Sequence, residues 1–132
     1  MWPFKKKQPR EEVTVEGVTA KPMARDSWEF SVDGLDFMIT GKEFDPRAIQ
    51  WARDAAREIR RLEPEIVKAV RESLEEAEEL DLGSAKLFIV DLSEYGKDRY
   101  FSVTYVGDDS WGDMGVDVTI HDGKIISADA GD

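Results

Sequence analysis

The pattern of hydrophobic and polar positions is helical in the middle of the chain and alternating on both sides of it. Within residues 44–82, apolar side chains recur at spacings of three and four, which indicates helices with one face packed on a core. Phe44, Asp45 and Pro46 mark the helix start, because a side-chain acceptor followed by proline favours the first turn. Gly83 marks the end.

Pro64 leaves two interpretations of this region. One kinked helix of about 36 residues would be about 54 Å long at 1.5 Å per residue, whereas a compact domain of this length has a diameter of about 35 Å. A break at Glu63 and Pro64 gives two helices of about 26 Å, which fit the domain. We therefore predict a helical hairpin, with the kinked rod as the alternative.

Alternating segments before the helical region predict β-structure. A short edge strand with a turn or bulge at Glu16 and Gly17 comes first. Residues 27–32 and 35–40 then flank the pair Asp33-Gly34, which favours a two-residue hairpin turn. The predicted register pairs apolar residues on one face: Val32 with Leu35, Phe30 with Phe37, and Trp28 with Ile39.

After the helical region, residues 87–90 are an unbroken apolar run, which predicts a strand covered on both faces at the centre of the sheet. Three alternating segments predict an antiparallel meander: residues 100–106, 114–120 and 124–128. The fold class that follows is α+β, a mostly antiparallel sheet of five or six strands with two helices, split at Pro64, packed on one face.

The length of 132 residues suits one domain, which we place at residues 11–132 behind a basic flexible tail at residues 1–10. No apolar run approaches the roughly 18 residues of a membrane span, and the N-terminus lacks the apolar core of a signal peptide. We therefore expect a cytoplasmic protein. The chain has no cysteine, which excludes disulfides and thiolate metal sites.

The charge distribution narrows the classes of partner. The formal net charge is -11, from 18 Lys and Arg against 29 Asp and Glu. Residues 1–10 hold four of the basic residues and no acid, so the rest of the chain carries 14 basic against 29 acidic residues, a charge of -15. Such a surface repels nucleic-acid phosphates and attracts basic proteins. We therefore expect no nucleic-acid partner and predict a basic protein surface as the partner.

An acidic cluster stands where a helix would end: Glu72, Glu75, Glu76, Glu78, Glu79 and Asp81. A helix C-terminus favours cations, so this cluster breaks a local rule, and such breaks are enriched at functional sites. One interpretation is a docking patch for a basic partner. The other is a solvated face neutralised within the hairpin, where Arg47 and Arg53 would lie near Glu79 and Glu75.

A second acidic cluster lies in the loop at residues 107–113 and just beyond: Asp108, Asp109, Asp113 and Asp117. Such carboxylates are weak candidates for Ca²⁺ or Mg²⁺, although their spacing does not match an EF-hand. Alternatively the loop is a tight turn in which Trp111 folds back over the sheet edge or serves as a protein-contact anchor. His121 is the only histidine, and we assign no catalytic residue and no cofactor.

Several C-terminal motifs resemble the end of small bacterial domains of unknown function: Ser110-Trp111-Gly112, Val116-Asp117-Val118, Asp122-Gly123 and Ala128-Asp129-Ala130-Gly131. In those domains a helical segment precedes a β-meander that carries a Trp-Gly pair. Some of them are thought to act as immunity proteins that neutralise a toxin. The resemblance covers about the last 25 residues and carries over no catalytic residue.

The leading hypothesis is a non-catalytic acidic domain that binds a basic protein, an immunity-type neutraliser of a basic toxin being its specific form. Its predicted contacts are Glu72, Glu75, Glu76, Glu79, Asp81 and Trp111. One alternative is a metal-dependent binder or hydrolase that uses Asp108, Asp109, Asp113 and Asp117. Another is a structural module tethered to a membrane surface, at about 1 kcal/mol per lysine near the lipid, through Trp2, Phe4, Lys5, Lys6 and Lys7.

Overall fold

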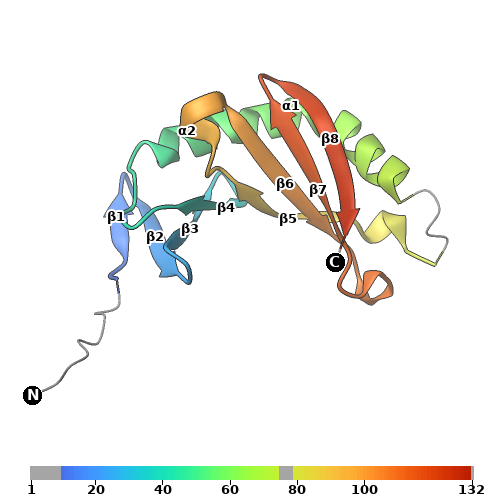
Figure 1. The fold of residues 1–132 in the computed structure, drawn as a ribbon, viewed down its shortest axis with the longest axis horizontal. Helices are drawn as coiled ribbons and strands as arrows, with labels where there is room; N and C mark the ends of the chain where they lie inside the picture. The colour runs from blue at the N-terminus through green and yellow to red at the C-terminus, as the bar shows by residue number, and fades with distance from the viewer. Residues whose placement is uncertain (1–9, 75–78, 132) are drawn as a thin grey trace, which may run out of the picture.

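The computed structural model describes residues 10–74 and 79–131, which form a single sheet of eight strands with one long helix (Figure 1). Four strands precede the helix: β1 (Val13–Val15), β2 (Val18–Met23), β3 (Ser27–Val32) and β4 (Leu35–Thr40). Helix α1 (Ala48–Ser73) follows. The remaining elements are η1 (Leu82–Ser84), β5 (Lys86–Asp91), α2 (Tyr95–Asp98), β6 (Tyr100–Val106), η2 (Asp109–Trp111), β7 (Gly115–His121) and β8 (Lys124–Gly131).

Helix α1 is continuous, so the predicted helical hairpin is wrong. It runs for 26 residues through Pro64, a length of about 39 Å. The rod fits the domain because α1 ends at Ser73 rather than at Gly83. Leu62 and Ile66, which flank Pro64, are only 3% and 0% exposed. A break there would expose packed side chains, and the helix accommodates the missing backbone hydrogen bond instead.

The sheet also differs from the predicted one in size and direction. The strands follow one another in sequence order, and each neighbouring pair is antiparallel except β4 and β5, which are parallel. A helical hairpin would return the chain to the end of the sheet that it left, whereas one helix carries it to the other end, so the next strand runs parallel to β4. The sheet is therefore mixed, and residues 13–23 contribute two strands rather than one.

The predicted register of the first large hairpin is confirmed. Val32 lies opposite Leu35, and the next inward pairs follow as expected. Asp33 and Gly34 have φ of 51° and 80°, the left-handed conformations that this two-residue turn requires. Strand β5 is central, as predicted, but it is not covered on both faces, because the helices of the described residues lie on one side of the sheet. Phe88, which lies at an irregularity between Leu87 and Ile89, is 58% exposed.

The core lies between α1 and one face of the sheet. On β6, the inward side chains of Phe101, Val103 and Tyr105 are buried, whereas those between them are half-buried. Helix α2 lies on the same side, because its buried Tyr95 packs against Trp51 of α1 and Phe101 of β6, with ring centroids 6.2 and 5.9 Å apart. In Figure 1 no helix of the described residues covers the other face.

The start of α1 lies two residues beyond the predicted one. Asp45 Oδ1 accepts a hydrogen bond of 2.9 Å from the Arg47 backbone N–H, and the helix begins at Ala48. The side-chain hydrogen bond from Arg47 holds the pKa of Asp45 below its ordinary value. Phe44 packs against Trp28 and Phe30, with ring centroids 5.9 and 5.3 Å apart, and so fixes the chain that enters the helix.

Two further expectations concern the N-terminal tail and membrane-spanning helices. The tail is predicted at residues 1–10, and residues 1–9, with all of the proposed lipid contacts, are not among the described residues. Arg10 is described and belongs to the folded domain, because its guanidinium lies over the Trp28 ring, 5.0 Å from the centroid, and donates to the Gly41 carbonyl at 3.3 Å. Within the described residues, no helix combines the length and the apolar character needed to cross a membrane.

Candidate functional site

The uncovered face of the sheet carries a polar surface over strands β5 to β8, which we call the open face. Because Val90 and Val103 point into the core, their neighbours Asp91 and Ser102 point outward, and these two lie opposite each other. The outward positions continue across β6, β7 and β8 with Thr104, Asp117, Thr119, Ser127 and Asp129. The middle of the open face is thus made of carboxylates and hydroxyls, and the same alternation places Tyr100, His121 and Lys124 at one end of the strands and Lys86 at the other.

Two of these carboxylates face each other directly. Asp117 on β7 lies opposite Asp129 on β8, an arrangement that destabilises an antiparallel pair. Thr104 Oγ1 donates a hydrogen bond of 2.5 Å to Asp117 Oδ1, which satisfies part of that charge. None of the ion pairs among residues 10–74 and 79–131 involves either aspartate.

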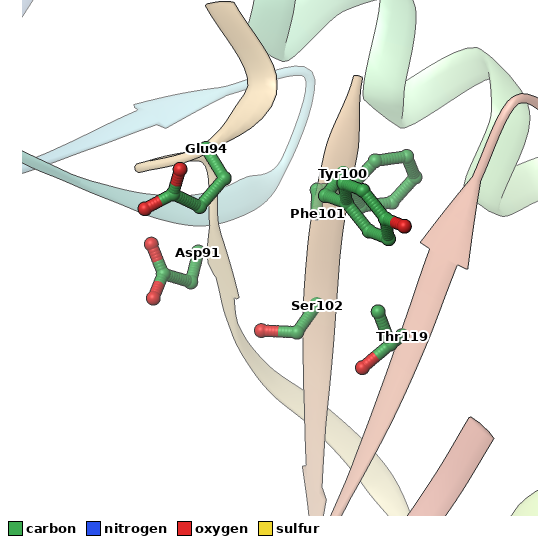
Figure 2. Close-up of a pocket in the computed structure, with 6 residues that line it drawn as sticks. All are labelled: Asp91, Glu94, Tyr100, Phe101, Ser102 and Thr119. Atoms are coloured by element: carbon green, nitrogen blue, oxygen red, sulfur yellow. The ribbon is translucent and has the colours of Figure 1, made fainter. Parts of the chain in front are cut away.

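A hollow of about 250 Å³ opens on the same face beside these strands. Figure 2 shows the carboxylates of Asp91 and Glu94 on one side of it, with the hydroxyls of Ser102 and Thr119 on the adjacent strands. Asp91 Oδ1 accepts a hydrogen bond of 2.9 Å from the Ser93 backbone N–H, which fixes that carboxylate. Two carboxylates with hydroxyl acceptors in a shallow hollow suit a lysine or arginine side chain.

The ring of Tyr100 closes one end of the hollow and is itself fixed. Tyr100 stacks on His121 with centroids 4.1 Å apart and planes 9° apart. His121 Nε2 lies 3.5 Å from Asp122 Oδ2. The histidine therefore orients an aromatic wall.

The predicted acidic patch is only partly within the described residues, because Glu75, Glu76 and Glu78 fall outside them. Glu72 is exposed on α1, and its Oε1 lies 3.8 Å from Lys68 Nζ. Asp81 precedes η1 and accepts a hydrogen bond of 3.0 Å from the Gly83 N–H, and Glu79 is exposed.

The arginines expected to neutralise this patch have other partners. Arg47 Nη2 lies 2.7 Å from Asp45 Oδ2, and Arg53 Nη1 lies 3.6 Å from Glu16 Oε2. The expected pairing of Arg47 and Arg53 with the acidic patch depended on a second, antiparallel helix, which the fold does not have.

The Trp111 loop and the segment after α1 are joined, a connection that the sequence did not reveal. Trp111 is 3% exposed, and its Nε1 donates a hydrogen bond of 2.8 Å to the Asp81 carbonyl. The Asp81 N–H donates to Ser110 Oγ at 2.9 Å, and the Asp108 N–H donates to Ser84 Oγ at 2.9 Å. The interpretation in which Trp111 folds back on the sheet is the one that this geometry supports, since the indole is not presented at the surface.

The four aspartates proposed for a metal ion are not gathered into one site. Asp108 turns toward Ser110, whose side-chain and backbone hydrogen bonds lower the pKa of that carboxyl. Asp117 instead points onto the open face toward Thr104. Among the residues that the structure describes, no group of three or more His, Asp or Glu side chains is placed to hold a metal ion.

The open face includes acidic residues that the sequence reasoning did not single out, namely Asp91, Glu94 and Asp129. The sequence signal for these residues is the alternation of polar residues along the last strands. The face of the sheet on which they lie depends on the register of strand pairing, which this alternation alone does not determine. No protein-family model matches the chain, and neither the curated proteins nor the solved structures include a significant match.

Proposed function

We propose that this protein is a non-catalytic binding domain whose open face receives a basic surface of another protein. The observation that carries the proposal is the set of outward carboxylates without an ion-pair partner among the described residues: Asp91, Glu94, Asp117 and Asp129. A partner's lysine or arginine placed among them would form charge-assisted hydrogen bonds and relieve the repulsion between Asp117 and Asp129.

The distribution of arginines supports this choice of face. Three arginines, one just before α1 and two within it, form ion pairs with nearby acidic residues: Arg47 with Asp45, Arg53 with Glu16, and Arg57 with Asp54. These pairs reduce the charge on the helix side, so the excess of negative charge lies elsewhere. A concentrated negative face raises the association rate with a basic partner and makes that rate sensitive to salt.

The proposal concerns the charge and shape of the partner, and a basic toxin is one member of that class. It also includes the cytoplasmic location expected from the sequence, which cell fractionation with an antibody to the chain tests. Recovery in a membrane or secreted fraction would contradict that location.

The experiment compares two variants with the same change in charge. In D91N/D117N/D129N three carboxylates are removed from the open face, and in E12Q/E63Q/E65Q, which we call the α1 variant, three exposed carboxylates are removed, two of them from α1. Each protein is immobilised and exposed to a cell extract of the source organism, and retained proteins are identified by mass spectrometry. We expect one basic protein to be retained by the wild type and the α1 variant, and lost with the open-face variant.

Purification of that protein then allows association rates to be measured at 50 and 300 mM salt, conditions that differ in screening length by a factor of about 2.4. We expect the open-face variant to associate at least tenfold more slowly at low salt, with a flatter salt dependence. Equal retention by both variants, or no basic protein on the wild type, would rule the proposal out. Circular dichroism verifies that both variants are folded.

A further inference from the structure

A groove between α1 and α2 is a basic region in an otherwise acidic protein. It consists of two hollows of about 460 and 390 Å³. They share three lining residues, Asp54, Tyr95 and Arg99, and are therefore adjacent. Five cationic side chains line the groove, against two carboxylates: Arg47, Arg57, Arg61, Lys97 and Arg99. The chain as a whole has a net charge of -11, so this local excess is not a general property of the surface.

Two of the cations are available to a ligand. Neither Lys97 nor Arg99 takes part in an ion pair with any described residue, and both are exposed. The Arg99 guanidinium lies over the Tyr95 ring, 5.9 Å from its centroid. Arg99 has φ of 57° because it ends α2 in the left-handed conformation, and its backbone N–H donates to the Tyr95 carbonyl.

The wall of the groove is aromatic. Trp51 is half-buried, with the Arg47 guanidinium over its ring at 5.2 Å and the ring of Tyr95 at 6.2 Å. Gly96 makes this arrangement possible, because a Cβ at that position would lie 2.6 Å from Trp51 Cη2. The absence of a side chain at Gly96 lets the indole pack against the backbone of α2 at the edge of the groove.

We infer that this groove binds a small phosphate ester that carries a planar ring, a mononucleotide being the simplest example. Arginine matches the geometry of a phosphate through paired N–H donors, and the Arg47 guanidinium that lies over the Trp51 ring offers a planar surface on which a further ring can stack. The larger hollow, about 460 Å³, is within the range of small-molecule sites. A long polyanion is a poor ligand, because the negative charge beyond the groove repels it, whereas a compact one stays within a screening length of the cations.

The test measures the binding of four probes to the full-length protein by calorimetry at 50 mM salt: AMP, inorganic phosphate, adenosine and a 20-nucleotide single-stranded DNA. We expect AMP to bind at least tenfold more tightly than inorganic phosphate or adenosine, because it uses the cations and the ring together. Titration with AMP should also move the NMR signal of the Trp51 indole N–H.

Matched variants separate the groove from bulk charge. K97Q/R99N removes two of the three groove cations that have no ion pair with any described residue, and it leaves Arg61, which donates a hydrogen bond to the Gly123 carbonyl. Asparagine suits the left-handed conformation of Arg99. R25N/K86Q makes the same changes outside the groove, since Arg25 has φ of 61° and both residues are exposed. We expect AMP affinity to fall at least tenfold in the first variant and less than twofold in the second.

A third variant tests the aromatic wall. G96A places a methyl group against Trp51 and should weaken AMP several-fold while leaving inorganic phosphate unchanged. Equal losses in the two charge variants, AMP no tighter than inorganic phosphate, or DNA tighter than AMP would each overturn the inference. An absence of AMP binding at millimolar concentration would do the same.

Discussion

Asp117 on β7 lies directly opposite Asp129 on β8, and no cation of the described residues forms an ion pair with either. Two like charges in this position weaken the pairing of the strands. The pair is therefore a cost to stability, which a cation from a binding partner would offset. This relationship connects the stability of the free protein to the proposed use of the open face.

The first prediction is that D129N stabilises the free protein. Removal of one charge of the pair should raise the free energy of unfolding by about 0.2–1 kcal/mol at low salt. Asp129 is the better position to change, because Asp117 accepts the hydrogen bond from Thr104. Urea unfolding at 20 mM and 500 mM salt measures the effect, which should shrink at high salt because the repulsion is screened.

E63Q on the exposed surface of α1 is the control for this prediction. It removes one negative charge, as D129N does, so it reports the general effect of making the net charge of this acidic protein less negative. A gain from D129N no larger than the gain from E63Q would show that the opposed pair has no specific cost.

The same pair shows why the site was harder to predict than the hairpins. The turn at Asp122 and Gly123 fixes the first pairs of the last hairpin, and a regular ladder from that turn would set Asp117 opposite Ala128. The irregularity in the ladder, between Thr119 and Ile120 on β7, shifts the register by one residue, so Asp129 takes that place and reaches the open face. An extra residue in a strand has no clear sequence signal here, although one such residue changes which side chains share a face.

The fold prediction failed at Pro64 for a related reason. The rule that proline ends a helix is local and takes no account of the packing on either side. Leu62 and Ile66 are both buried, so the helix continues because the tertiary contacts outweigh a local cost of about 3 kcal/mol. The register of β3 and β4 was predictable, since Asp33 and Gly34 suit one turn type and alternation determines the inward face.

The second prediction follows from the continuous helix. P64A should stabilise the protein by about 1–2 kcal/mol, because alanine restores a backbone donor and removes a steric clash, less the entropy that proline takes from the unfolded chain. Pro64 is exposed, so few packing contacts are lost. Urea unfolding measures the change, and a loss of stability would instead favour a turn at this position.

The third prediction concerns the link between the Trp111 loop and the segment after α1. A Cβ at Gly107 would lie 2.2 Å from Trp111 Nε1, so G107A must displace the indole and break its hydrogen bond to the Asp81 carbonyl. We expect a loss of about 2 kcal/mol or more, together with a shift of the Trp111 indole N–H signal in NMR spectra.

G131A is the control for the Gly107 variant, because a Cβ at Gly131 would meet nothing within 4 Å. It should change the free energy of unfolding by less than about 0.5 kcal/mol. If the two variants are equally stable, the indole is not held against Gly107 in solution.

The last prediction uses the buried phenol of Tyr105. Burial raises the pKa of Tyr105 above its ordinary value, and the negative charge of Glu63 adds to this effect. The folded protein therefore favours the neutral phenol more than the unfolded chain does. This part of the stability is fully present below the unfolded pKa of about 10 and is lost as the pH rises through the higher folded pKa.

Y105F should accordingly lose less of its thermal stability than the wild type between pH 8 and pH 11. Burial also raises the pKa of Tyr95, so Y95F should act in the same direction and the double variant should be the most resistant to alkali. Melting temperatures measured across that range would contradict the assignment if Y105F and the wild type lost stability in parallel.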